Sequence, residues 1–155
     1  MDQALRLLKF RARSEQEMAE RLQKKGFSAE WAQQTVARLR ELNLLNDAAL
    51  ARDMTESRRR GGRGDHRIRQ ELRKRGLPKA VADQALGGVA AESGAERAWG
   101  ALQKRAARLK GLDRDAAYRR LHGHLVRQGF GVDDVRGALK RFFSGEPEGW
   151  GTNEP

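Results

Sequence analysis

Three segments of this 155-residue chain resemble one another, and each carries a glycine at the same place. The glycines are Gly26, Gly76 and Gly129, which lie 50 and 53 residues apart, and each precedes Phe or Leu. A repeat of this length indicates one supersecondary unit that is used several times. A chain built in this way must bury its apolar surface by packing neighbouring units together.

The apolar residues around these glycines superimpose without a gap. Four sets of equivalent positions are apolar in all three segments: Met18, Ile68 and Leu121; Leu22, Leu72 and Leu125; Ala32, Ala82 and Val135; Val36, Leu86 and Leu139. Within each segment these positions are four residues apart, before the glycine and again after it. This spacing places side chains on one face of a helix. Each segment is therefore predicted to hold two amphipathic helices joined at the glycine.

Local signals in the first segment support this prediction. Ser14 and Glu17 have the spacing of a capping box, in which each side chain binds the other residue's backbone N–H. Gly26 is expected to end that helix in the left-handed conformation. Ser28 is then positioned to cap the next helix.

The later segments show weaker signals of the same kind. Pro78 is expected at the first helical position after Gly76, where the missing N–H is harmless. Gly131 stands where the first segment has Ser28, so the cap of the last helix is predicted to be weaker.

A further helix precedes each pair. The first is expected from residue 4 to about residue 12, and the third from residue 95 to about residue 109. Asp47 is predicted to cap the second, which contains Leu50 and Met54.

The fold class predicted from these patterns is all-α, with three tandem three-helix repeats forming an elongated, curved array. The repeats are predicted at residues 1–46, 47–93 and 94–143. Residues 144–155 are rich in Gly, Pro and Glu and are expected to form a flexible tail.

The amino-acid composition limits the range of functions that the chain can have. The chain carries 32 Lys and Arg against 21 Asp and Glu, a formal net charge of +11 that favours a polyanionic partner. It contains no cysteine, which excludes disulfides, thiolate nucleophiles and cysteine zinc sites. No apolar stretch approaches the roughly 20 residues that span a bilayer, and the N-terminus shows no basic region followed by an apolar block, as a signal peptide would. We therefore expect a cytoplasmic protein without a membrane partner.

The positive charge is densest in the middle of the chain. Nine basic and two acidic residues occur from Arg58 to Arg75, with three glycines at positions 61, 62 and 64. A basic helix start after a loop of this kind is a natural anion site, whereas the alternative is a solvated basic helix and loop. The candidate contact residues for a polyanionic partner are Arg58, Arg59, Arg60, Arg63, Arg67, Arg69, Arg73 and Lys74.

Residues for catalysis do not assemble. His122 and His124 point about 200° apart on a helix, so they cannot share a metal ion. No serine or cysteine nucleophile with a histidine base can be preferred. The sequence therefore predicts no enzyme activity, no catalytic residue, no metal and no cofactor. Aromatic residues make up 6% of the chain, so any nucleic acid would be bound through its phosphate backbone and without sequence specificity.

Several stretches resemble the sequence pattern of the RecX family of recombination regulators. The opening signature lies at residues 13–27, and later parts of the pattern lie at 44–51, 64–77 and 125–130. The resemblance covers residues 4–143. It implies an all-α fold of three three-helix repeats, no enzyme activity, and binding to the RecA recombinase filament. It also implies inhibition of RecA ATPase and strand exchange in DNA repair and recombination, including the SOS response.

We expect a monomer that lies along the groove of the RecA filament and contacts single- or double-stranded DNA non-specifically. Two alternatives remain open at this point. One is a helix-turn-helix transcriptional regulator, since helices joined by a glycine turn also occur in that class. The other is a nucleoid-type or RNA-binding protein that acts without RecA.

Overall fold

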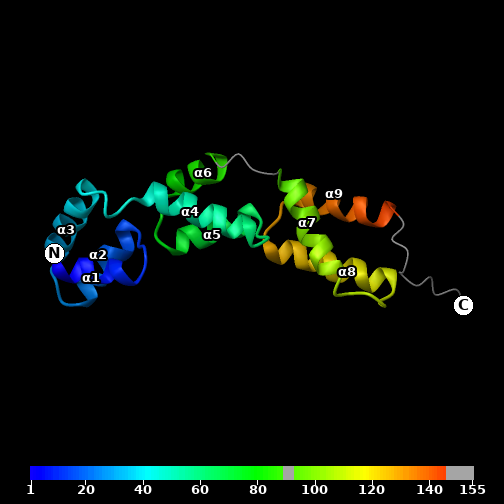
Figure 1. The fold of residues 1–155 in the computed structure, drawn as a ribbon, viewed down its shortest axis with the longest axis horizontal. Coiled ribbons are helices and arrows are strands. Elements are labelled where there is room, and N and C mark those ends of the chain that lie inside the picture. Colours follow the sequence, from blue (N-terminus) through cyan, green and yellow to red (C-terminus); the bar gives the residue numbers. More distant parts are fainter. Residues whose placement is uncertain (89–92, 146–155) are drawn as a thin grey trace, which may run out of the picture. The chain divides into compact units, whose positions relative to one another are not determined.

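The computed structural model describes residues 1–88 and 93–145, and within these ranges every regular element is an α-helix (Figure 1). The helices are α1 (Asp2–Phe10), α2 (Glu15–Lys24), α3 (Ala29–Glu41), α4 (Asp47–Arg60), α5 (Asp65–Lys74), α6 (Lys79–Gly88), α7 (Gly94–Ala106), α8 (Arg114–Gln128) and α9 (Val132–Ser144). The all-α prediction with helical repeats is confirmed. Of the tail predicted at 144–155, residues 146–155 lie outside the described ranges. No helix in those ranges is long and apolar enough to cross a membrane.

The chain forms two compact units. Among the described residues, 1–56 and 69–88 belong to unit 1, whereas 57–68 and 93–145 belong to unit 2. The division passes through α4 and α5, so both helices contribute residues to both units.

The core of each unit follows the register predicted from the repeats. All twelve apolar residues matched by the repeat alignment are at most 8% exposed. In unit 1, Met18, Leu22 and Leu39 are fully buried between α1, α2 and α3. In unit 2, Leu102 and Leu125 are fully buried in the cluster formed by α7, α8 and α9. The gapless alignment is therefore confirmed by burial.

Helix starts follow the predicted capping chemistry in three places. Ser14 Oγ accepts a hydrogen bond from the Glu17 backbone N–H at 3.0 Å, and Glu17 Oε2 accepts one from the Ser14 N–H at 3.1 Å. Ser28 Oγ accepts from the N–H of Trp31. Gly131 precedes α9 without a side-chain cap, as expected.

The prediction that Asp47 caps α4 is wrong. Asn46 is the capping residue, because its Oδ1 accepts a hydrogen bond from the Ala49 N–H at 2.9 Å. Asp47 is the first residue of α4, and its Oδ1 accepts from the Glu15 N–H at 2.9 Å. That N–H belongs to the first turn of α2, where backbone donors lack a partner within the helix. Asp47 thus ties α4 to α2 within unit 1.

Pro78 lies one position earlier than predicted. The first residue of α6 is Lys79, and the carbonyl of Pro78 accepts the hydrogen bond from the Ala82 N–H. A residue whose carbonyl accepts the first helical bond occupies the N-cap position. Pro78 therefore occupies the N-cap position of α6 and not the first helical position.

In unit 1 the start of α2 meets the end of α5. Ser14 Oγ, which is fully buried, donates a hydrogen bond to the carbonyl of Arg75. The Arg75 guanidinium binds both oxygens of the Glu17 carboxylate, at 2.6 and 2.9 Å. Burial raises the pKa of Glu17, but the hydrogen bonds from Arg75 and Arg11 outweigh it and hold this pKa below its usual value.

The same joint recurs in unit 2, between the start of α5 and the end of α8. The N–H of Gly64 donates to the carbonyl of Gln128 at 2.8 Å, and the N–H of His66 donates to the carbonyl of Gly129 at 3.2 Å. In the repeat alignment Gly64 is equivalent to Ser14, and Gln128 to Arg75. Each of the first two repeats therefore places the start of its second helix against the end of the next repeat's second helix.

Replacing Ser14 with alanine tests the joint in unit 1. The change removes a helix cap and a buried bond to the next repeat, so we expect a loss of about 2 kcal/mol in the free energy of unfolding. Ser28→Ala is the matched control, since Ser28 is an exposed cap with one bond, and should cost about 1 kcal/mol. Urea denaturation followed by circular dichroism measures both. Equal losses would contradict a role for Ser14 between repeats.

Candidate anion-binding interface

The eight arginine and lysine residues predicted as contacts are divided between the two units. Those in unit 2 are Arg58, Arg59, Arg60, Arg63 and Arg67, and those in unit 1 are Arg69, Arg73 and Lys74. Their surroundings differ, so they cannot all serve the same purpose.

Arg59 is engaged within the fold of unit 2. Its side chain is 9% exposed, and it binds both carboxylate oxygens of Asp65, at 3.1 and 3.0 Å. Arg97 of α7 is equally buried and binds the same oxygens at 2.8 and 3.1 Å. Burial raises the pKa of Asp65, but the hydrogen bonds from Arg97 and Arg59 outweigh it and lower this pKa overall. Arg59, Asp65 and Arg97 thus join α4, α5 and α7.

Arg69 is paired in unit 1. Its Nε lies 3.0 Å from Asp83 Oδ1 of α6, and Lys79 Nζ lies 3.1 Å from the other oxygen of that carboxylate. The hydrogen bonds from Lys79 and Arg69 lower the pKa of Asp83. Arg69 thus links α5 to α6 and is half-buried.

The remaining predicted residues lie at helix ends and in the loop between α4 and α5. Arg73 and Lys74 are exposed in the last turn of α5, and Arg60 is exposed at the last position of α4. Arg58, Arg63 and Arg67 are half-buried, and Arg67 donates to the backbone carbonyl of Arg127 at 3.2 Å. The exposed pair at the end of α5 is the most accessible part of the predicted surface in unit 1.

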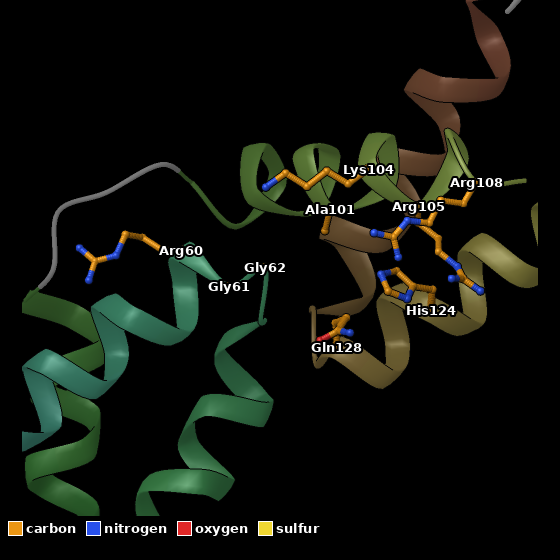
Figure 2. A pocket seen from close by; sticks show the side chains of 9 residues that line it. All are labelled: Arg60, Gly61, Gly62, Ala101, Lys104, Arg105, Arg108, His124 and Gln128. Carbon is orange, nitrogen blue, oxygen red and sulfur yellow. The ribbon is translucent and has the colours of Figure 1, made fainter. Parts of the chain in front are cut away.

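A second cationic feature is a pocket of about 330 Å³ within unit 2 (Figure 2). It lies between the end of α4 with the loop that follows, the second half of α7 with the turn that follows, and the second half of α8. Its lining residues are Arg60, Gly61, Gly62, Ala101, Lys104, Arg105, Arg108, His124 and Gln128. Four of these nine are Lys or Arg, and none is Asp or Glu.

The cations at the end of α7 and in the turn after it are not neutralised within the described ranges. Lys104, Arg105 and Arg108 form no ion pair there, and the buried Nε of Arg105 has no hydrogen-bond partner among those residues. Figure 2 shows the Arg105 guanidinium next to the His124 ring. Burial, followed by the charges of Arg105 and Arg127, lowers the pKa of His124. The imidazole is therefore neutral at pH 7, and the positive charge of the pocket comes from the Lys and Arg side chains.

Sequence reasoning missed most of this pocket. Only Arg60 was among the predicted contacts, because the other cations lie outside the densest basic stretch. A partial signal was present, since Lys104 and Arg105 follow Ala101 by three and four residues, which places these three on one helix face. Arg108 lies in the turn after that helix. His124 and Gln128 are likewise four residues apart on α8. Neither pattern shows that the two faces meet, which depends on tertiary packing.

No group of three or more His, Asp or Glu side chains that could hold a metal ion occurs in the described part of the chain. His122 and His124 both lie on α8, where His122 is exposed and stacks on Tyr118 while His124 faces the pocket. The chemistry that this interface offers is the binding of anions.

Comparisons with known proteins give the family. Residues 1–39 match the model of the first three-helix domain of RecX, and residues 46–86 match that of the second. Among relatives named Regulatory protein RecX, that of Prosthecochloris aestuarii is 35% identical over 140 residues, which cover 90% of this chain and 90% of the relative. The relative from Trichlorobacter lovleyi is 37% identical and covers 86% of this chain and 88% of its own length.

Solved structures agree on the fold. The crystal structure of RecX from Lactobacillus salivarius superimposes with a TM-score of 0.79 at 19% identity, over 90% of this chain and 92% of that one. A second crystal structure of regulatory protein RecX gives a TM-score of 0.78 at 22% identity, over 91% of this chain and 71% of that one. With the sequence relatives and both domain models, these findings show that the chain belongs to the RecX family of regulatory proteins.

Proposed function

We propose that this chain modulates the RecA recombinase, mainly as an inhibitor. In this proposal it binds as a monomer in the groove of the RecA–DNA filament, in the cytoplasm, and limits filament growth, ATP hydrolysis and strand exchange. It takes part in DNA repair and recombination, including the SOS response, by binding rather than by catalysis. The observation that carries the proposal is membership in a family of regulatory proteins named RecX.

The distribution of charge supports a nucleoprotein partner. Each unit presents exposed cations, such as Arg73 and Lys74 in unit 1 and Lys104 and Arg108 in unit 2. Cations at both units suit a partner with a repeating negative surface, such as a DNA backbone coated with protein. Surplus positive charge also accelerates association with such a partner, in a manner that salt weakens.

Inhibition then follows from unequal affinity for filament states. A bound protein shifts an equilibrium only as far as it binds one state more tightly than another. If the chain binds best to protomers that are held in one arrangement, it opposes the rearrangements that accompany ATP turnover and the addition of further protomers. No reaction at the bound protein is needed.

Filament growth on single-stranded DNA tests the proposal. RecA extension is followed by light scattering after nucleation, with and without the purified chain. We expect extension to stop at chain concentrations well below that of RecA. Unchanged filament growth when this protein and RecA are present in equal amounts would contradict the proposal. If RecA is displaced from the DNA only at concentrations at which this protein covers the DNA, the nucleoid-type alternative is favoured instead.

Charge reversal at the end of α5 tests the predicted basic surface. We expect Arg73→Glu with Lys74→Glu to raise the concentration needed for half-inhibition of filament growth about tenfold, because two exposed cations become anions. Arg69 is kept, since its pair with Asp83 holds α5 to α6.

The matched control is Lys24→Glu with Lys25→Glu, which makes the same charge change at the equivalent end of α2. Circular dichroism should show unchanged helicity for both double variants. Equal weakening by the two would mean that net charge, and not the predicted surface, determines inhibition.

A further inference from the structure

We propose that the cationic pocket between α4, α7 and α8 of unit 2 binds a phosphodiester group of a nucleic-acid backbone, held by Lys104, Arg105 and Arg108. The inference rests on the proposed function in one respect, which is that the RecA filament supplies the nucleic acid. The site lies in the third repeat and, apart from Arg60, outside the basic stretch that the sequence pointed to.

Charge is the first reason. Lys104 and Arg105 lie in the last turn of α7 and Arg108 lies in the turn just after it, and no carboxylate lines the pocket with them. They form no ion pair within the described ranges, whereas Arg59, Arg97 and Arg141 of the same unit are each paired with Asp or Glu. Like charges gathered without a counter-ion repel one another, so an anion that enters the pocket relieves this repulsion.

The donors that line the pocket are the second reason. Arg105 already lies partly out of solvent, and its buried Nε–H lacks an acceptor among the residues that the structure describes. An arginine can direct two parallel N–H groups at one phosphate, and such bonds are stronger than those between neutral groups. The Gln128 amide and the neutral His124 imidazole add N–H donors from α8.

The wall opposite α7 is the third reason. It consists of the backbone of Gly61 and Gly62, which carry no side chain, just after the end of α4. A chain-like ligand can therefore approach closely on that side. With a volume of about 330 Å³, the pocket is at the small end for ligand sites.

The lining also distinguishes a backbone from a free nucleotide. No Phe, Tyr or Trp lines the pocket, so nothing there can stack on a base. Specific nucleotide sites need contacts to the base, whereas binding to a nucleic-acid backbone needs only phosphate contacts. The pocket is therefore suited to a phosphate that is held in place by its neighbours along a strand.

The test uses the full chain without RecA. Fluorescence anisotropy with a labelled single-stranded oligonucleotide of mixed sequence gives the dissociation constant at several salt concentrations. We expect Lys104→Glu with Arg108→Glu to weaken binding at least tenfold and to lower the slope of log K against log salt by about 1 to 2. Arg105→Lys keeps the charge but loses the paired donors, and should weaken binding several-fold.

Arg136→Glu with Lys140→Glu is the control, because it makes the same charge change on the exposed face of α9 in the same unit. We expect it to weaken binding less than threefold. Equal weakening by the two double variants, or no weakening by the pocket variant, would overturn the assignment. Circular dichroism melting confirms that each variant is folded.

The NMR resonances of the His124 ring distinguish binding of a nucleic-acid strand from binding of small phosphates. The chain has three histidines, so the ring resonances of His124 can be assigned by His124→Gln. We expect them to shift with the oligonucleotide at micromolar concentration, and with inorganic phosphate or pyrophosphate only at much higher concentration. Saturation by pyrophosphate at micromolar concentration, with unchanged oligonucleotide affinity in the pocket variants, would overturn the nucleic-acid assignment.

These measurements are independent of RecA inhibition. If the pocket variants lose DNA affinity but the wild-type chain does not affect RecA, the proposed function fails and the pocket assignment stands. If the wild-type chain inhibits RecA and the pocket variants bind DNA normally, the assignment of the pocket fails and the proposed function stands.

Discussion

Replacing Gly64 with alanine is expected to lower the free energy of unfolding by about 3 kcal/mol, a large effect for the addition of a single methyl group. A Cβ at this position would lie 2.2 Å from the carbonyl oxygen of Gly129 and 2.4 Å from the nitrogen of Phe130. These are backbone atoms, so no side-chain rotation can relieve the clash. The start of α5 would have to move away from the end of α8, and the bond from Gly64 N–H to Gln128 would be lost with it.

Gly137→Ala provides the matched control. Gly137 is exposed within α9, and a Cβ there meets nothing within 4 Å. Alanine favours a helix interior over glycine by up to about 1 kcal/mol, so this variant should be more stable than the wild type. Urea denaturation followed by circular dichroism compares the two. A Gly64→Ala variant as stable as the wild type would show that α5 and α8 are not held as described.

Replacing Asp65 with asparagine is expected to cost about 2 kcal/mol at pH 7. The change leaves Arg59 and Arg97, each 9% exposed, without their counter-charge. Breaking a fully buried pair costs more, but Asp65 is itself 35% exposed, so solvent reduces the loss. Asp133→Asn is the control, because Asp133 is 97% exposed and should change stability by less than about 0.5 kcal/mol.

The pH dependence of this loss has a defined sign. The pKa of Asp65 is lower in the folded chain than in the unfolded chain. Its carboxylate therefore stabilises the fold fully above the unfolded pKa of about 4, and this contribution disappears as the pH falls through the folded value. We expect the difference between wild type and Asp65→Asn to shrink below about pH 4. A difference that stays constant from pH 7 to pH 3 would contradict the role of the charge.

Repetition and capping made most of the fold predictable from the sequence. The equivalence of Leu22, Leu72 and Leu125 follows from spacing alone, and all three are fully buried. The failures concern side chains whose partner is distant in sequence. Asp47 has the residue type and the position of a helix cap, yet its carboxylate binds the backbone of Glu15, 32 residues away. No local pattern encodes that contact.

The candidate site was less predictable, for a related reason. Counting charges found the stretch from residue 58 to 75, but it could not tell a paired arginine from an accessible one. Arg59 and Arg73 have similar sequence surroundings, although Arg59 is held by a carboxylate and Arg73 is exposed. The pocket depends on helix faces that meet only in the folded chain. For this reason Arg105 was not among the contact residues predicted from the sequence.

The central claim is that this RecX family member acts on the RecA filament, and RecA's DNA-dependent ATPase tests it most directly. The chain is titrated against RecA on saturating single-stranded DNA, with enough DNA that the chain can cover only a small part of it. The account predicts strong inhibition when RecA protomers greatly outnumber the chain. Full ATPase activity at that ratio, with inhibition only when the chain coats the DNA, would contradict it.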